Sequence, residues 1–194
     1  MDRAYRFELR PAERARDLPR MVEIENACFP PKLAYTRDEI RRFMRAPNAQ
    51  CMVAVNRETG RQGGFVIVSW RQRSQVGYVQ TLDVAPEEQG NGLGRLLLET
   101  AERIMAERGL TRSILQVYLR NNGALMLYLK TGYTIRRART RYYRNSFKGA
   151  RDALELVKEL TPMAPTLLVA PEVSLVTSEV SALPNPPKIG RAHV

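Results

Sequence analysis

Three alternating glycines, Gly90, Gly92 and Gly94, separate an apolar segment from a long amphipathic segment, and this feature constrains the fold more than any other. A helix that begins directly behind such a turn presents unpaired backbone N–H groups at its positive end, an arrangement that can hold a phosphate. Residues 80–133 are therefore predicted to form a strand, the glycine-rich turn, a helix, a second strand and a shorter helix. The first helix is indicated by apolar residues that recur on one face: Leu96, Leu97, Ala101, Ile104 and Met105.

The glycine-rich turn differs from two other phosphate-binding motifs. No Gly-Lys-Ser/Thr closes it, as a P-loop requires, and a dinucleotide fingerprint read from Gly90 would have Arg95 at its third glycine. The run Gln89-Gly90-Asn91-Gly92-Leu93-Gly94 instead resembles Q/R-x-x-G-x-G/A, the pyrophosphate loop of the GNAT superfamily of N-acetyltransferases.

A second motif follows at the distance that this superfamily shows. Its pattern is N-x-x-A-x-x-L-Y-x-x-x-G-F/Y, and the residues that agree with it are Asn121, Ala124, Leu127, Tyr128, Gly132 and Tyr133. Two motifs in register make the resemblance specific. Within the superfamily, residues 24–160 look most like the RimI-type enzymes, which acetylate protein N-termini.

The resemblance implies acetyl-CoA as co-substrate and indicates what would hold it. Backbone N–H groups of the turn would bind the pyrophosphate, since glycine lets the chain approach without a Cβ. The strand backbone before the turn would pair with the pantetheine arm and polarise the thioester carbonyl, and the side chain of Asn121 would bind the same arm. The expected cofactor contacts are Leu82, Asp83, Val84, Gln89, Gly90, Asn91, Gly92, Leu93, Gly94, Arg95 and Asn121.

Tyr128 is expected to be the general acid. A phenol that stays protonated at neutral pH can give its proton to a departing thiolate. A tyrosine on an apolar helix face is more often a packing residue, but the L-Y-x-x-x-G-Y context favours the catalytic interpretation.

The sequence departs from the RimI-type pattern at Gln116. That group carries a glutamate base in a Leu-Glu-Val-Arg context, where this chain reads Leu-Gln-Val-Tyr. A glutamine cannot take a proton, although it can orient a water or the amine. Three explanations stay open: another base, with Tyr78 the main candidate and Glu25 a weaker one; an amine that loses its proton to water before binding; or slow turnover. The expected catalytic residues are Tyr128, Tyr78 and Gln116.

The acceptor is expected to lie between two loops. By resemblance, Tyr142 and Tyr143 would grip the substrate backbone on the hairpin before the last strand, and residues 29–36 would form the opposite wall. A tyrosine pair on a strand has its rings on opposite faces, so at most one of these two is expected to touch substrate. No acidic residue precedes Asp38 in that wall, so nothing there would select a basic peptide.

Periodicity predicts the α/β order β-α-α-β-β-β-α-β-α-β-β, a mixed central sheet flanked by helices, which is the order of the GNAT fold. The predicted strands are residues 5–9, 51–56, 64–70, 75–84, 113–118, 134–139 and 153–156. The predicted helices are residues 17–29, one that Thr36-Arg37-Asp38-Glu39 opens as a capping box, the amphipathic helix after the glycine-rich turn, and residues 124–131. The helix of residues 17–29 would end at Pro30-Pro31.

Residues 1–160 are expected to form one domain, and the proline-rich residues 161–194 a disordered tail. The end, Lys-Ile-Gly-Arg-Ala-His-Val, looks like the translation of a sequencing adapter, so residues 188–194 are expected to be an artefact. His193, the single histidine of the chain, lies there, and no metal site is expected.

The composition limits the partners. Two cysteines, no apolar signal core and no apolar run of bilayer length predict a cytoplasmic protein without a membrane partner. The net charge of +11 is interpreted as a basic surface that attracts a polyanionic cofactor. Association with the ribosome stays open, and sequence-specific nucleic-acid recognition is disfavoured. The densest basic group is Arg136, Arg137, Arg139, Arg141 and Arg144.

The function expected from these observations is acetyl transfer from acetyl-CoA to an amine, with the N-terminal α-amine of a ribosomal protein as the substrate that the resemblance favours. The alternatives are a small-molecule amine or a lysine side chain. A catalytically inactive acetyl-CoA-binding module is a third alternative, and Gln116 is the residue that keeps it open.

Overall fold

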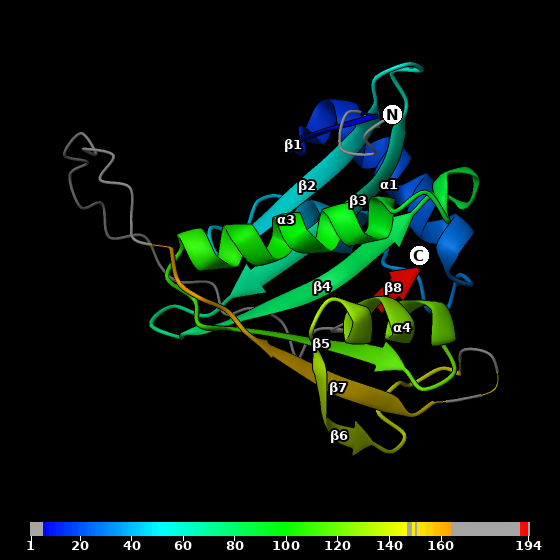
Figure 1. Cartoon of the computed structure of the whole chain (residues 1–194). Coiled ribbons are helices and arrows are strands. Elements are labelled where there is room, and N and C mark those ends of the chain that lie inside the picture. The colour runs from blue at the N-terminus through cyan, green and yellow to red at the C-terminus, as the bar shows by residue number, and fades with distance from the viewer. Residues whose placement is uncertain (1–5, 147–148, 150, 164–190, 194) are drawn as a thin grey trace.

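The computed structural model describes residues 6–146, 149, 151–163 and 191–193. In these residues the helices and strands follow the expected order, with one further strand at the end (Figure 1). The elements are β1 Phe7–Pro11, α1 Arg14–Cys28, α2 Arg37–Phe43, β2 Ala49–Asn56, β3 Gln62–Trp70, β4 Val76–Val84, the 3-10 turn η2 Pro86–Glu88, α3 Leu93–Glu107, β5 Arg112–Tyr118, α4 Asn122–Lys130, β6 Thr134–Arg139, β7 Ala153–Glu159 and β8 Arg191–His193.

The strands form one mixed sheet in the order β1-β2-β3-β4-β5-β7-β6, and β8 pairs with β4 outside this path. All neighbours are antiparallel except β4 with β5 and β4 with β8, which are parallel. The β4–β5 pairing is short, because only Val76–Tyr78 pairs with β5. Further along, β4 pairs at Thr81–Asp83 with β8 instead. The two central strands therefore separate towards the glycine-rich turn and admit a third strand between them.

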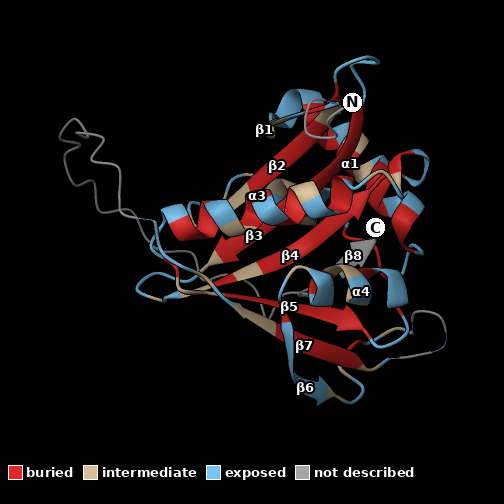
Figure 2. Ribbon diagram, viewed as in Figure 1, coloured by how far each residue is buried: buried red, intermediate tan, exposed pale blue. Residues whose placement is uncertain are grey.

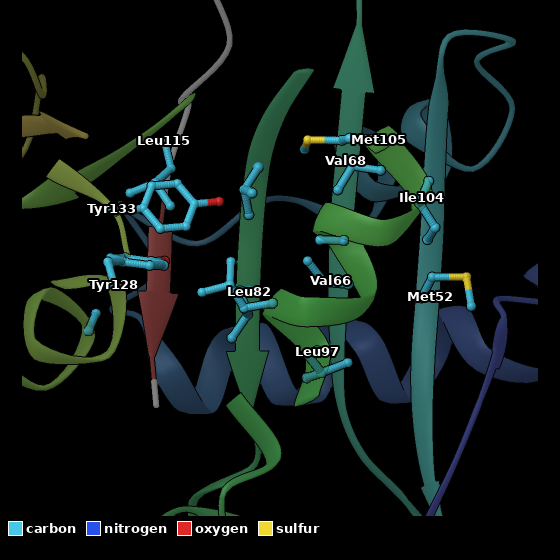
Figure 3. Packing of buried hydrophobic residues seen from close by; sticks show 14 of the residues in the cluster. Met52, Val66, Val68, Leu82, Leu97, Ile104, Met105, Leu115, Tyr128 and Tyr133 are labelled. Carbon is cyan, nitrogen blue, oxygen red and sulfur yellow. The ribbon is translucent and has the colours of Figure 1, made fainter. Parts of the chain in front are cut away.

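Helices cover both faces of the sheet. One core cluster, here called the α3 cluster, packs α3 and α4 on one face and includes Val66, Leu82, Leu97, Leu115, Tyr128 and Tyr133 (Figure 3). The other, the α1 cluster, packs α1 and α2 on the opposite face and includes Met21, Ile40, Phe65, Tyr118 and Tyr143. The central strands are buried on both sides, whereas β6 is exposed along almost its whole length (Figure 2).

Local signals in the sequence explain how the helices begin and end. The capping box is confirmed, since Glu39 N–H donates to Thr36 Oγ1 at 3.3 Å and Thr36 N–H donates to Glu39 Oε2 at 2.8 Å. Helix α1 ends at Cys28, before the two prolines as expected, but it begins at Arg14, ahead of the predicted start. None of the helices in the described ranges is long and apolar enough to cross a bilayer.

The predicted tail lies largely outside the described residues, since residues 164–190 and 194 are not among them. Within the tail, Arg191–His193 forms β8, a strand that the sequence did not predict. The prediction that residues 188–194 are an artefact stays a prediction.

Candidate functional site

The glycine-rich turn has the backbone geometry that its sequence requires. Gly90 and Gly92 have φ angles of 76° and 81°, in the left-handed region that residues with a Cβ rarely adopt. Gly92 is the N-cap of α3; within the described part of the chain no side chain caps the helix, and its first turn carries no acidic residue. The positive end of α3 is thus left for an anion. A hollow of about 270 Å³ lies beside it, with Asn91, Gly92 and Arg95 in its lining.

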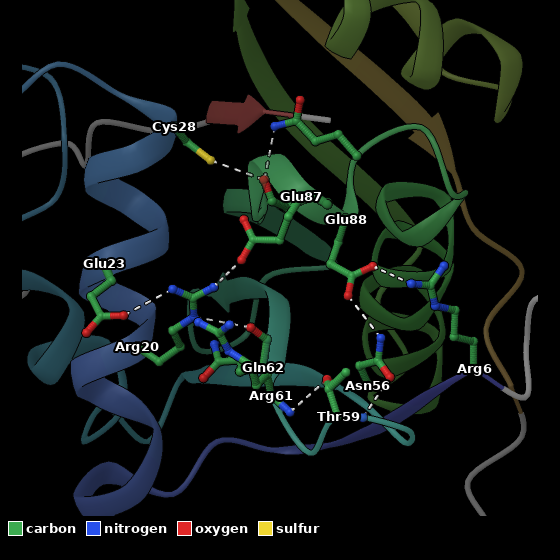
Figure 4. Close-up of polar contacts among 12 residues, drawn as sticks. Arg6, Arg20, Glu23, Cys28, Asn56, Thr59, Arg61, Gln62, Glu87 and Glu88 are labelled. Carbon is green, nitrogen blue, oxygen red and sulfur yellow. Dashed lines mark hydrogen bonds and ion pairs between the residues drawn. The ribbon is translucent and has the colours of Figure 1, made fainter.

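Polar side chains hold the segment that leads into this turn (Figure 4). Gln89 Nε2 and the thiol of Cys28 both donate to the carbonyl oxygen of Val84, at 3.1 and 3.4 Å. Buried Glu88 accepts from Asn56 Nδ2 at 3.0 Å and pairs with Arg6 at 3.2 Å. The side chain of Gln89, expected as a cofactor contact, thus fastens the turn to the end of β4.

An ion pair from α1 holds the same segment before the glycine-rich turn. Arg20 Nη2 donates to Glu87 Oε1 at 2.6 Å, and Arg20 Nε donates to the backbone oxygen of Gln62 at 3.3 Å. Helix α1 and strand β3 are thereby tied to η2, directly before the glycine-rich turn.

The backbone of β4 beyond Tyr78 is accessible to an extended chain, because β8 pairs with it there. Leu82 and Val84, the expected pantetheine contacts, are buried in the α3 cluster. The intervening Asp83 is fully buried, and Thr81 Oγ1 donates to its Oδ2 at 2.9 Å. The β4 backbone at this point therefore fits an extended chain with hydrogen-bonding groups, such as the pantetheine arm.

Tyr128 is fully buried on α4, and its hydroxyl has no hydrogen-bond partner among the described residues. Its ring lies 5.7 Å from that of Tyr133, centroid to centroid (Figure 3). Burial raises the pKa of the Tyr128 phenol, and the charge of Asp83 raises it further. The phenol therefore stays protonated at neutral pH and has a proton to donate.

Asn121 occupies the N-cap position of α4, but its side chain makes no capping hydrogen bond. It is 5% exposed, so the side chain is buried.

Gln116 contacts a buried carboxylate on the neighbouring strand. Leu115 and Val117 belong to the α3 cluster, so strand alternation turns Gln116 to the opposite face. There it lies opposite Glu155 of β7, and its Nε2 donates to Glu155 Oε2 at 3.1 Å. The other end of the amide, Oε1, is buried without a hydrogen-bond partner in the described part of the chain.

Arginines of β6 surround Glu155. Arg137 Nε donates to its Oε1 at 2.8 Å, Arg139 Nε donates to its Oε2 at 2.9 Å, and Arg136 lies within ion-pair distance at 3.6 Å. Burial opposes ionisation of Glu155, but hydrogen bonds from Arg137, Arg139 and Gln116 outweigh it and lower the pKa of the carboxyl. Glu155 is therefore an anchored anion and a poor proton acceptor.

Tyr142 and Tyr143 lie in the connection between β6 and β7, outside the strands. The prediction that strand alternation sends their rings to opposite faces is wrong, because the rings meet edge to face at 5.0 Å. Tyr143 also stacks on Tyr118 of β5, with centroids 3.6 Å apart, and Arg139 lies 5.1 Å from the ring of Tyr142. Because Arg139 contacts both Glu155 and Tyr142, Glu155 and the three tyrosines lie in one region.

The two candidate bases lie in different settings. Tyr78 is partly exposed in the paired part of β4, opposite Ile114 of β5, so it is not a core residue. Glu25 is fully buried on α1 and accepts from the N–H of Tyr35 at 2.7 Å. Its carboxylate holds the α1–α2 loop.

The loops expected to flank the acceptor approach one another. Asn145 Nδ2, in the β6–β7 connection, donates to the backbone oxygen of Lys32 in the α1–α2 loop at 2.7 Å. A cavity of about 490 Å³ opens between them, lined by Pro30, Pro31, Lys32, Leu33, Asn145 and Ser146. Among the described residues that line it, none is acidic.

Sequence reasoning missed Glu155 and the side chain of Asp83, which had been considered only with its backbone. A charged residue in the apolar strand Ala-Leu-Glu-Leu-Val was a signal for the first. Its partners depend on strand register, which the sequence does not contain.

Comparison with known proteins identifies relatives. A model of the acetyltransferase (GNAT) family matches residues 18–133. Mycothiol acetyltransferases are similar over shorter stretches: that of Catenulispora acidiphila is 43% identical over 67 residues, and that of Amycolatopsis mediterranei 45% over 60. These matches cover 34% and 31% of this chain but 21% and 20% of the relatives, so the chain spans about a fifth of the length of these curated relatives.

Solved structures share the fold. The ribosomal-protein-S18-alanine N-acetyltransferase from Escherichia coli superposes with a TM-score of 0.71 at 22% identity, covering 84% of this chain and 99% of that one. Ard1 from Thermoplasma volcanium gives 0.69 at 18% identity, covering 80% and 98%. At these identities the likeness shows the fold alone, and it confirms the predicted fold class.

Proposed function

Because the chain belongs to the acetyltransferase (GNAT) family, we propose that it transfers the acetyl group of acetyl-CoA to an amine, and that this amine is the N-terminal α-amine of a protein. The observation that carries the transfer is the conjunction of an uncapped, glycine-led helix end with a buried, protonated, unpartnered phenol at the separation of β4 and β5.

The roles proposed for the chain's own groups follow from their positions. The N–H groups at the start of α3 bind the pyrophosphate, while the β4 backbone around Leu82 and the buried side chain of Asn121 hold the pantetheine arm. Acetyl-CoA, when bound, supplies a thioester whose carbonyl carbon accepts the amine. Apolar residues of the α3 cluster exclude water from the arm.

Tyr128 supplies the proton that the departing thiolate needs during acetyl transfer. The neutral amine nitrogen forms the new C–N bond as the C–S bond of the thioester breaks. Tyr128 donates its proton to the departing sulfur and regains one, through solvent, from the proton that the nitrogen loses. Its raised pKa suits an acid that stays loaded at neutral pH.

Three observations support a protein N-terminus as acceptor. The cavity between the α1–α2 loop and the β6–β7 connection is open to a chain end. Tyr142, in the same β6–β7 connection, is partly exposed and offers a flat ring and a hydroxyl for a peptide backbone. The fold likeness to the Escherichia coli ribosomal-protein enzyme points the same way. Ribosome association belongs to the same proposal.

A small-molecule amine is the second candidate. The similarity to two mycothiol acetyltransferases, at 43% and 45% identity, favours it, although that similarity covers only about a third of this chain.

The test is coenzyme A release by the full chain with acetyl-CoA and a panel of acceptors. The panel contains peptides with free Ala, Ser, Met and Gly N-termini, the same peptides blocked at the N-terminus but bearing lysine, and simple polyamines. We expect turnover with free N-termini. Turnover with polyamines alone would favour the second candidate, and turnover with none of these amines would contradict the proposal.

A further inference from the structure

Gln116 stands where a base is expected, and its contacts fix which end of its amide is available. Glu155 is ionised and can only accept hydrogen bonds, so Gln116 must turn its NH₂ group towards it. Oε1 is then the end left over. It is buried at a residue only 2% exposed and has no partner among the described residues. A buried acceptor left unpaired requires an explanation, and a substrate donor is one.

From this arrangement we infer that Gln116 Oε1 accepts a hydrogen bond from the acceptor amine, that Glu155 is the positioning residue that orients this amide, and that the enzyme takes its amine already neutral. The inference rests on the proposed amine acetylation and adds a substrate class to it: primary amines of low pKa. An α-amine with a pKa near 8 is about one-quarter neutral at pH 7.5, whereas a lysine amine near 10.4 is neutral in roughly one molecule per thousand.

Several contacts converge on this orientation. Arg137 and Arg139 hold Glu155 as an anion that cannot offer a proton to Gln116. Arg139 also packs on the ring of Tyr142, which contacts Tyr143. The amide is thereby linked, through Glu155 and Arg139, to the tyrosines of the β6–β7 connection, and the carboxylate beside it is too stabilised as an anion to serve as the base.

Other groups on this face could act as the base, and the test must discriminate against them. The charged and titratable groups that face this part of the sheet are Glu155 from β7, Arg136, Arg137 and Arg139 from β6, Tyr78 and Asp83 from β4, Tyr118 on β5, Tyr142 from the β6–β7 connection and Glu25 from α1.

The first experiment measures log(kcat/KM) against pH for peptides that differ only in their N-terminal residue: alanine, a fluorinated alanine whose amine is less basic, and β-alanine whose amine is more basic. The expected profile rises with pH and levels at the pKa of each acceptor's own amine, so the break moves with the acceptor. A break at one pH for all acceptors would assign the proton to an enzyme group and overturn the inference. If only small amines react, a matched alkylamine series gives the same test although the N-terminal proposal has failed. If no amine is turned over, both the proposed function and this inference are contradicted.

The second experiment uses variants. Gln116→Met keeps the length of the side chain without an acceptor oxygen, and Glu155→Gln keeps its shape but lets the Gln116 amide turn. Both are expected to raise the KM of the amine about tenfold, with kcat and the KM of acetyl-CoA little changed, because the lost hydrogen bond exists in both the ground and transition states. Glu102→Gln, the same change at the half-buried Glu102–Lys158 pair, is the matched control and should leave the amine KM unchanged.

A third variant is expected to remove the dependence of the pH break on the acceptor. Gln116→Glu introduces a carboxyl beside an anion that arginines hold ionised, so its own pKa is raised and it can act as a base. The pH break should then stop following the acceptor. The NMR signals of the Gln116 side-chain amide give a readout independent of turnover. One N–H should be shifted by Glu155 in the wild type and not in Glu155→Gln; identical signals in both would contradict the positioning role.

Discussion

The hydroxyl of Tyr128 shows how a single residue can be costly to folding and suited to chemistry. It is fully buried and unpaired in the described part of the chain, whereas the nearby hydroxyl of Tyr133 lies 2.7 Å from Ser113 Oγ. A buried hydroxyl without a partner destabilises a fold, and a bound substrate or cofactor can satisfy it.

Tyr128→Phe is therefore expected to raise the stability of the free protein by about 1 kcal/mol, while lowering kcat by roughly 100-fold and leaving acetyl-CoA binding intact. Thermal unfolding, isothermal titration and steady-state kinetics measure the three quantities. Tyr133→Phe, which breaks a satisfied hydrogen bond, should lose about 1 kcal/mol and keep its kcat. Full activity in Tyr128→Phe would show that another group is the acid.

Individual site residues were predictable where motifs are local. Tyr128, Asn121 and the glycines follow from spacing along the chain, and their proposed roles remain predictions. The Gln116–Glu155 contact was not predictable, because 38 other residues intervene and only strand register brings the two together. Tyr142 and Tyr143 were misjudged for a different reason: strand alternation was applied to them, although the predicted strand of residues 134–139 and the observed β6 both end before them.

At the scale of elements, the glycine-rich turn converts a strand into a helix end that can bind an anion. Its positive φ angles cost an L-residue strain, but strain alone does not separate a binding role from a turn role. Gly60, in the β2–β3 turn, provides the comparison: it has φ 66°, and a Cβ there meets nothing within 4 Å, as at Gly90.

Gly90→Ala and Gly60→Ala should each lower the free energy of unfolding by about 1 kcal/mol, as measured by urea denaturation. Only Gly90→Ala should also raise the KM of acetyl-CoA, by about tenfold, because it alone displaces the N–H groups proposed to bind pyrophosphate. Equal KM values for acetyl-CoA in the two variants would show that the glycine-rich turn has only a structural role.

The start of α1 depends on one carboxylate. Asp17 accepts from Arg10 Nη1 and Nη2 at 2.6 and 2.8 Å and from the N–H of Glu13 at 2.7 Å, which ties β1 to the helix. Burial opposes the charge of Asp17, but the hydrogen bonds from Arg10 and Glu13 outweigh it and lower its pKa below the ordinary value of an aspartate.

The stability that Asp17 contributes is therefore present above the unfolded pKa of about 3.9 and is lost as the pH falls through the lower folded value. Asp17→Asn is expected to cost about 2 kcal/mol at pH 7 and much less near pH 2, by urea denaturation at both pH values. A difference that does not depend on pH would show that the charge contributes nothing.

The order of elements was predictable because each has its own period or cap. The separation of β4 from β5 was not, since both strands are buried along almost their whole length and give no local sign of where their pairing stops.

At the scale of the molecule, the strand β8 and the proposed co-substrate use the same backbone. Residues Thr81–Asp83 pair with β8, and they flank the proposed pantetheine contact at Leu82. Composition could not indicate this pairing, because residues 161–194 carry no periodic pattern.

A chain that ends at Met163 is therefore expected to bind acetyl-CoA at least severalfold more tightly than the 194-residue chain, since a competing occupant reduces the binding-competent fraction. Calorimetric titration of both chains measures the ratio. Weaker binding by the shorter chain would mean that β8 contributes to the site.

At this scale the net charge of +11 is a weaker guide to a polyanion-binding surface than the sequence suggested. Three arginines of the densest basic group, Arg136, Arg137 and Arg139, are engaged by Glu155, so this part of the +11 charge is paired with a buried carboxylate. It is not simply a free surface for polyanions.

The most direct test of the central claim is a competition within one molecule. A peptide with a free N-terminal alanine and an internal lysine is incubated with the protein and acetyl-CoA, and fragment-ion mass spectrometry locates the acetyl group. Acetylation of the α-amine alone is expected. Acetylation of the lysine, or of neither amine while polyamines react, would contradict N-terminal acetylation.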